Sequence, residues 1–148
     1  MYYIAYGSNL NMAQMAHRCP DAIPVGTAML RDWRLVFRTH ATIEPCRKVP
    51  MSWVPVVVWE ISERDEQALD RYEGYPRYYD KRELDIDMRP LYNGEKVVPV
   101  KAMVYIMTKG PEIFAPSDAY YETIYEGYRR FGLGVVPLRR ALKESLEV

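Results

Sequence analysis

Cysteine is scarce in this sequence, and the cysteines present form no pattern. Cys19 and Cys46 are the only two among 148 residues, and they lack both CxxC spacing and the numbers for a disulfide framework. Reduced thiols are the simplest interpretation, and they are typical of a cytoplasmic protein. No basic segment followed by an apolar one precedes the first predicted strand, and no apolar run approaches the length of a membrane span. We therefore expect a cytoplasmic location and no membrane partner.

An excess of charge of either sign is missing as well. Lys plus Arg and Asp plus Glu both total 20, so the formal net charge is zero. Nucleic acids and anionic membranes both require a basic surface on their partners. The composition therefore argues against nucleic acid as a partner.

Motifs for phosphate, metal or nucleophile chemistry are also lacking. The sequence has no Walker A loop, no GxGxxG, and no GxSxG around Ser8. Its two histidines, His17 and His40, are far apart and have no cysteine or carboxylate cluster at ligand spacing. We predict no metal and no cofactor, and the pattern disfavours a serine hydrolase.

The elements that are present suit one domain covering residues 1–148, because the length and the 49% hydrophobic content allow one proper core. Hydrophobic patterning predicts strands at residues 2–6, 54–61, 79–88 and 97–107, and one or two strands within 25–38 with a bend near Asp32. Helices are predicted at residues 11–18, 62–73, 117–130 and 137–146. Asn93-Gly94 predicts a hairpin turn, and the polar segment 39–52, with its prolines, predicts a loop. Many strands with few helices between them favour an α+β fold whose mixed sheet curls towards a barrel.

The first predicted strand ends in an unusual turn, Tyr6-Gly7-Ser8-Asn9. Glycine admits turns closed to other residues, and the Ser8 and Asn9 side chains can bond nearby main-chain groups. A strand that runs through such a turn into a helix leaves backbone N–H groups pointing one way, which makes a cradle for an anion or oxyanion. An ordinary tight turn explains the same residues, so the turn alone leaves both interpretations open.

The second unusual stretch is LDRYEGYPRYY, residues 69–79, at the end of the helix predicted for 62–73. Ser62 is a typical N-cap of that helix, Asp65 stands at the capping-box position, and Gly74 is a typical C′ residue. We expect the helix to turn Ala68, Leu69 and Tyr72 inward.

Glu73 lies in the last turn of that helix, where the negative end of the helix dipole disfavours a carboxylate. The rings of Tyr72, Tyr75, Tyr78 and Tyr79 crowd it in sequence. Both effects raise the pKa of a carboxyl group, which suits a proton shuttle near neutral pH. A solvated glutamate at a helix end is the alternative. The 13 tyrosines of the chain suit a pocket lining, or equally a half-buried sheet surface.

Together, YGSNL at residues 6–10 and LDRYEGYP at 69–76 resemble the γ-glutamylcyclotransferase family, including its AIG2-like relatives. Arg18-Cys19-Pro20, the strand VPVVVWEIS and the segment YYETIYEGYRRFGL extend the resemblance over nearly the whole chain. The resemblance implies a small mixed β-barrel with flanking helices. It also implies a reaction in which the α-amine of a γ-glutamyl group attacks its own γ-amide carbonyl and releases 5-oxoproline with an amine or amino acid.

Residue by residue, the resemblance implies that Glu73 is the catalytic acid/base. It implies substrate binding by the turn residues Tyr6, Gly7, Ser8, Asn9 and Leu10, with Tyr79 shaping the pocket. Tyr78 is a rival of Tyr79, because the spacing can slip by one residue. The expected partner is a small γ-glutamyl substrate, and a homodimer is left open.

One departure bears on the substrate. The glutathione-specific branch and many γ-glutamylamine-type relatives carry leucine after Tyr-Gly-Ser, whereas this chain has Asn9, which favours the γ-glutamyl amino acid branch. A γ-glutamylamine or other conjugate cyclotransferase, a non-catalytic binding module, and an unrelated amidohydrolase remain as alternatives. Residues 39–52 and 109–118 are the loops in which leaving-group specificity is expected.

Overall fold

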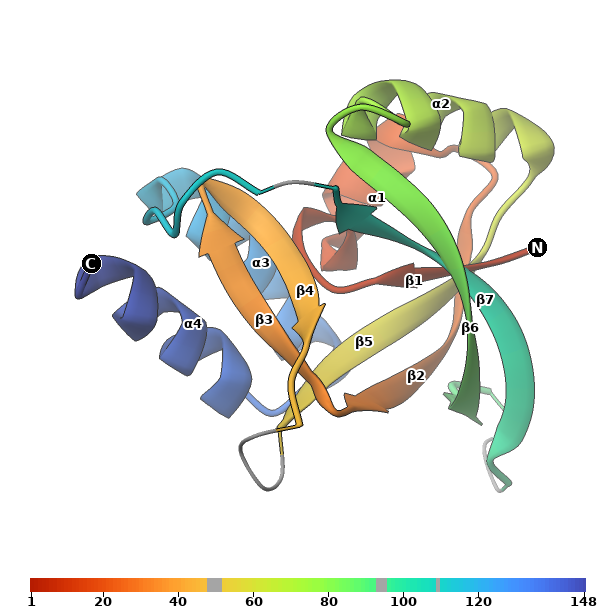
Figure 1. Ribbon diagram of the computed structural model, residues 1–148. Coiled ribbons are helices and arrows are strands. Elements are labelled where there is room, and N and C mark those ends of the chain that lie inside the picture. Colours follow the sequence, from red (N-terminus) through yellow and green to blue (C-terminus); the bar gives the residue numbers. More distant parts are fainter. Residues whose placement is uncertain (48–51, 93–95, 109) are drawn as a thin grey trace.

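The computed structural model describes residues 1–47, 52–92, 96–108 and 110–148. Five strands close into a barrel in the order β1-β5-β2-β6-β7, and β3 and β4 form a separate two-stranded sheet beside it. Helices flank both units (Figure 1). The predicted α+β fold with a small mixed barrel is confirmed.

The barrel is closed by strands from the two halves of the chain. β1 pairs antiparallel with β5 along its length and parallel with β7 through Tyr3 and Met103. The β-branched run of β5 puts Val54 and Val56–Val58 in the core, which explains why this strand is central. The bounds are β1 (Tyr2–Ala5), β2 (Ile23–Arg31), β5 (Trp53–Glu60), β6 (Tyr79–Pro90) and β7 (Val98–Met107).

The smaller sheet corrects one prediction. Segment 25–38 does contain two strands, because β2 gives way at Asp32, with φ 66°, to β3 (Trp33–Arg38). Residues 40–45 of the predicted loop are instead a strand, β4 (His40–Pro45), paired with β3. Burial overrides the polar composition here, because Ala41, Thr42 and Ile43 are all inside and Thr42 Oγ1 accepts a hydrogen bond from the N–H of Met107, at 3.1 Å.

The helices follow the capping signals. They are α1 (Met12–Arg18), α2 (Glu63–Glu73), α3 (Asp118–Phe131) and α4 (Val136–Leu146). Ser62 and Asp65 form the predicted capping box of α2, and Gly74 and Gly132 end α2 and α3 in the left-handed conformation, with φ 66° and 65°. In α2, Leu69 is fully buried, but Tyr72 is 45% exposed, so its expected inward orientation is wrong. The Tyr72 ring lies against the Arg18 guanidinium instead of in the core. The predicted Asn93-Gly94 turn lies outside the described residues.

The turn after β1 packs against α3. Residues Ser8–Leu10 form a 3-10 turn, η1, and Leu10 is fully buried beneath α3. A Cβ placed on Gly127 of α3 would lie 2.5 Å from Leu10 Cβ and 2.8 Å from its carbonyl carbon and oxygen. Only glycine allows this approach. In the described part of the chain, no helix has the length and apolar character needed to cross a membrane.

Candidate active site

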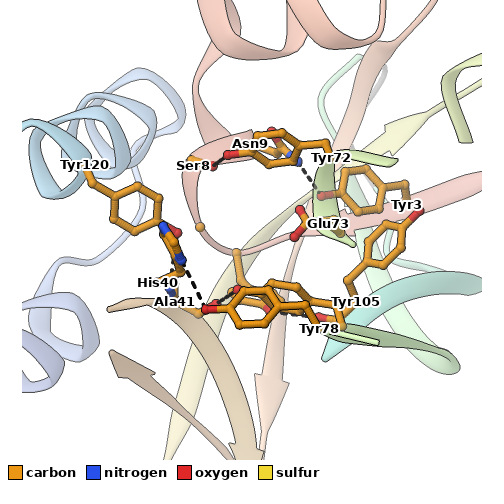
Figure 2. A pocket seen from close by; sticks show the side chains of 13 residues that line it. Tyr3, Ser8, Asn9, His40, Ala41, Tyr72, Glu73, Tyr78, Tyr105 and Tyr120 are labelled. Atoms are coloured by element: carbon orange, nitrogen blue, oxygen red, sulfur yellow. Dashed lines mark hydrogen bonds between the residues drawn. The ribbon is translucent and has the colours of Figure 1, made fainter. Parts of the chain in front are cut away.

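A cavity of about 160 Å³ opens where the turn after β1 meets the end of α2 (Figure 2). Elements from most of the chain line it, from β1 near the N-terminus to α3. Tyrosine is the dominant lining residue, which gives the walls apolar faces and polar tips. The lining residues are Tyr3, Tyr6, Gly7, Ser8, Asn9, His40, Ala41, Tyr72, Glu73, Tyr78, Tyr79, Tyr105 and Tyr120.

The two unusual stretches of the sequence therefore meet in one cavity. Of the residues singled out for the site, Tyr6, Gly7, Ser8, Asn9, Glu73 and Tyr79 line it. Leu10 does not: it lies in the core under α3, so it supports the turn from behind. Tyr78 and Tyr79 both line the cavity.

Gly7 has unusual backbone angles and little space for a side chain. Its φ of −120° and ψ of −131° are neither helical, extended nor left-handed. A Cβ at Gly7 would lie 3.3 Å from Ala41 Cβ and 3.6 Å from Tyr120 Oη, at the cavity wall. The N–H groups of Ser8 and Asn9 begin the 3-10 turn, where no carbonyl of the turn can accept from them. Both residues line the cavity, so the geometry suits a cradle.

Arg18 fixes the side chains of this turn. One of its guanidinium nitrogens, Nη1, donates to Asn9 Oδ1 and, at 3.3 Å, to Ser8 Oγ. The guanidinium lies 3.5 Å from the centroid of the Tyr72 ring, a cation–π stack. Asn9 Nδ2 in turn donates to Tyr3 Oη at 2.9 Å. The turn is therefore rigidly bonded to α1 and β1.

Glu73 is the acidic residue that lines this cavity, at the C-terminal end of α2 and half-buried. Burial raises its pKa to about 7, and the nearby positive charge of Arg18 opposes the rise. The predicted direction of the pKa shift is confirmed. A carboxyl group with this pKa exchanges protons readily near neutral pH.

The two rival tyrosines, Tyr79 at the start of β6 and Tyr78 just before it, occupy different depths. Tyr79 is buried and donates from Oη to the carbonyl oxygen of Ala41, at 2.7 Å. Tyr78 is 38% exposed, and its hydroxyl lies 3.2 Å from His40 Nδ1. Tyr79 thus joins β6 to β4 inside the cavity, whereas Tyr78 and His40 stand at its mouth.

Several lining residues were not predicted from the sequence as site residues. They are Tyr3, His40, Ala41, Tyr105 and Tyr120. The excess of tyrosine was the one available signal, since seven of the 13 line this cavity. Across the described ranges, no group of three or more His, Cys, Asp or Glu side chains is placed to hold a metal ion.

Comparison with known proteins identifies the family. Residues 3–130 match the family described as "Gamma-glutamyl cyclotransferase, AIG2-like". The chain belongs to this family. A mouse γ-glutamylcyclotransferase (Mus musculus) is 30% identical over 141 residues, 88% of this chain and 71% of that protein. The bovine protein of that name (Bos taurus) is 26% identical over 140 residues, with the same shares.

Solved structures share the fold of this chain. One titled "Gamma-glutamyl cyclotransferase" superposes with a TM-score of 0.75 at 27% identity, covering 97% of this chain and 85% of that one. YkqA from Bacillus subtilis also has a TM-score of 0.75, over 97% of this chain and 54% of that one, at 21% identity. The YkqA likeness shows the fold alone.

Proposed function

We propose that this chain is a γ-glutamylcyclotransferase that releases 5-oxoproline from a γ-glutamyl compound, with Glu73 as the general acid/base. The observation that carries the proposal is the position of Glu73. Its carboxyl group, with a pKa of about 7, lies in a tyrosine-walled cavity together with the turn of Gly7, Ser8 and Asn9. A proton shuttle and a cradle for negative charge are the two groups that an intramolecular aminolysis needs.

In the first step, ionised Glu73 takes a proton from the α-ammonium of the substrate. The freed amine attacks the γ-carbonyl carbon, a C–N bond forms, and the carbonyl oxygen becomes an oxyanion. Ring closure to five members is favoured by proximity, so the protein needs to fold the substrate and to manage protons. The N–H groups of Ser8 and Asn9 are the donors available in the turn for the oxyanion or the α-carboxylate.

In the second step, protonated Glu73 gives its proton to the leaving nitrogen, and the ring nitrogen, which is positively charged after the attack, releases its extra proton to solvent. The bond between that nitrogen and the γ-carbon breaks, and 5-oxoproline and a free amine or amino acid leave. Glu73 is then ionised again. The nucleophile belongs to the substrate, so the step uses no nucleophilic side chain of the protein.

A product screen tests this proposal. Purified protein is incubated with γ-glutamyl amino acids, γ-glutamylamines and glutathione, and 5-oxoproline is measured by mass spectrometry. We expect 5-oxoproline from at least one class. Since Asn9 stands where several relatives have leucine, we expect it foremost from γ-glutamyl amino acids.

Two substrate analogues make the screen specific for cyclisation. Acetylating the α-amine removes the nucleophile, and moving the amide link to the α-carboxyl removes the five-membered geometry. Both analogues should be inert. Glutamate as the first product, or cleavage of the N-acetyl compound, would show a hydrolase instead. A protein that binds γ-glutamyl compounds without turning any over would be a binding module on the same fold.

A further inference from the structure

The hydroxyl group of Tyr3 has a direction imposed by its neighbours. Arg18 can only donate hydrogen bonds, so its bond to Asn9 fixes the amide with Oδ1 towards Arg18 and Nδ2 towards Tyr3. Nδ2 then donates to Tyr3 Oη, at 2.9 Å. The Tyr3 oxygen is therefore an acceptor in this bond, and its one hydrogen must point elsewhere.

The place left for that hydrogen is the cavity. Tyr3 is only 4% exposed, and its ring is held edge-on against Tyr105, with centroids 5.9 Å apart. Among the described residues, no hydrogen bond has Tyr3 Oη as its donor, and none has the Glu73 carboxylate as its acceptor. Figure 2 shows the Tyr3 hydroxyl on the side of its ring towards Asn9 and Glu73. The Tyr3 hydroxyl, a donor without an acceptor, and the Glu73 carboxylate, an acceptor without a donor, thus line the same cavity.

We propose that Tyr3 is a positioning residue for Glu73. Arg18 and Asn9 turn its hydroxyl hydrogen towards the Glu73 carboxylate, to which Tyr3 donates once Glu73 is ionised. Hydrogen bonds in ligand-free sites are often long, and an ionised carboxylate is the stronger acceptor. The inference rests on the proposed role of Glu73.

Other groups around Glu73 bear on its ionisation as well. Arg18 of α1 supplies the positive charge, and His40 of β4 is the titratable group at the cavity mouth together with Tyr72 of α2. The remaining titratable groups are hydroxyls that ionise only at high pH, because burial raises their pKa values. They are Tyr3, Tyr6, Tyr78, Tyr79, Tyr105 and Tyr120. Among these groups, Arg18 is the one whose charge lowers the pKa of Glu73.

A hydrogen bond to the charged form of an acid lowers its pKa. Tyr3 therefore works against burial and keeps part of the Glu73 population ionised near pH 7. The Tyr3→Phe substitution removes the donor and keeps the ring, so the packing against Tyr105 is preserved. We expect the pKa of Glu73 to rise by about 1 pH unit in this variant.

The experiment is a pH titration of the Glu73 carboxyl carbon by NMR in the ligand-free protein, which needs no turnover. Tyr2→Phe is the matched control, because the alternation of strand β1 turns Tyr2 to the opposite face and Tyr2 does not line the cavity. The Tyr3→Phe variant should titrate at higher pH than the wild type, and Tyr2→Phe should not. An unchanged Glu73 titration in folded Tyr3→Phe overturns the inference.

A double-mutant cycle tests whether Asn9 acts through Tyr3. Asn9→Ala should raise the pKa of Glu73 in the wild-type background and add nothing in the Tyr3→Phe background. Equal shifts in both backgrounds overturn the relay. The acid limb of the kcat/KM profile should move with the NMR titration. If no γ-glutamyl compound is turned over while the NMR shifts appear, the proposed function fails and the positioning of Glu73 by Tyr3 stands.

Discussion

The two ends of α2 each carry a carboxylate, and the protein treats the two in opposite ways. Asp65, in the first turn, is fully buried, yet its oxygens accept from the N–H of Ser62 at 3.2 Å and from the N–H of Asp21 at 3.4 Å. It also lies at the positive end of the helix dipole. Glu73, in the last turn, is only half-buried, lies at the negative end, and is no hydrogen-bond acceptor among the described residues.

The difference shows that the role of a carboxylate, structural or reactive, depends more on the hydrogen-bond donors around it than on how deeply it is buried. Asp65 is surrounded by donors, so its negative charge is compensated and it stabilises the start of the helix. Burial without donors raises the pKa of Glu73 to about 7 and leaves it free to exchange a proton. One helix thus has a structural acid at one end and a reactive one at the other.

Glu73→Gln should give the largest effect. Glutamine keeps the size and polarity of the side chain and cannot shuttle a proton, so we expect turnover to fall by about a hundredfold or more. The free energy of unfolding should not fall, because the carboxylate has an unfavourable position. Initial rates of 5-oxoproline release and urea unfolding measure the two quantities. Near-normal turnover in the folded variant would remove Glu73 from the mechanism.

The turn that shares the cavity with Glu73 should be next in sensitivity. In Gly7→Val the added side chain meets Ala41 and Tyr120 and fills space at the cavity wall, so kcat/KM should fall by about tenfold or more. Ser8→Ala should cost less than about fivefold, because the backbone N–H groups remain. If Ser8→Ala abolishes activity and Gly7→Val is tolerated, the serine hydroxyl and not the backbone holds the substrate.

Asp65→Ala should have the opposite effects to Glu73→Gln, because it should lower stability and not change the pH dependence of activity. Losing the capping-box bond from the N–H of Ser62 and the bond from the N–H of Asp21, and leaving both donors unpaired, should lower the free energy of unfolding by about 2 kcal/mol. The pH profile of the remaining activity should keep its shape. The matched control is Glu63→Ala, an exposed acid in the same first turn, expected within about 0.5 kcal/mol of wild type. Equal destabilisation by both substitutions would contradict a special role for Asp65.

The smallest expected effect is the pH dependence of stability that Glu73 itself produces. Its ordinary pKa is 4.5 and its pKa in the folded protein is about 7. Between these values the folded state holds a proton that the unfolded state has lost, so the stability contribution of Glu73 falls as the pH rises through this range. The gain of Glu73→Gln over wild type should therefore grow between pH 5 and pH 8, by about 1 to 2 kcal/mol. Parallel pH curves for the two proteins would show that Glu73 has its ordinary pKa.

Local signals were sufficient where a residue acts through its immediate neighbours. The capping box of Ser62 and Asp65 and the glycine end of α2 at Gly74 depend on contacts within a few residues, and both are found as predicted. The pKa shift of Glu73 was predictable in direction for the same reason, because the tyrosines that crowd it are close in sequence.

Features built by distant contacts could not be predicted. The turn into β4 is made at Thr39, with φ 69° and no glycine or asparagine to mark it, so the local sequence predicts a loop where the strand lies. His40 and Tyr120 enter the cavity only because β4 and α3 are packed beside the turn after β1. The order of strands and helices and the resemblance to a family both predict a barrel, but neither predicts its closure, which pairs Tyr3 with Met103 across 100 residues of chain.

The contact between Gly127 and Leu10 leaves no room for α3 and the turn after β1 to move independently. The missing side chain at Gly127 lets the helix backbone rest directly on the Leu10 main chain. A ligand that reduces the mobility of the turn should therefore also reduce the mobility of the middle of α3. Amide hydrogen exchange around Gly127 should therefore be slower when a ligand is bound, although Gly127 does not line the cavity.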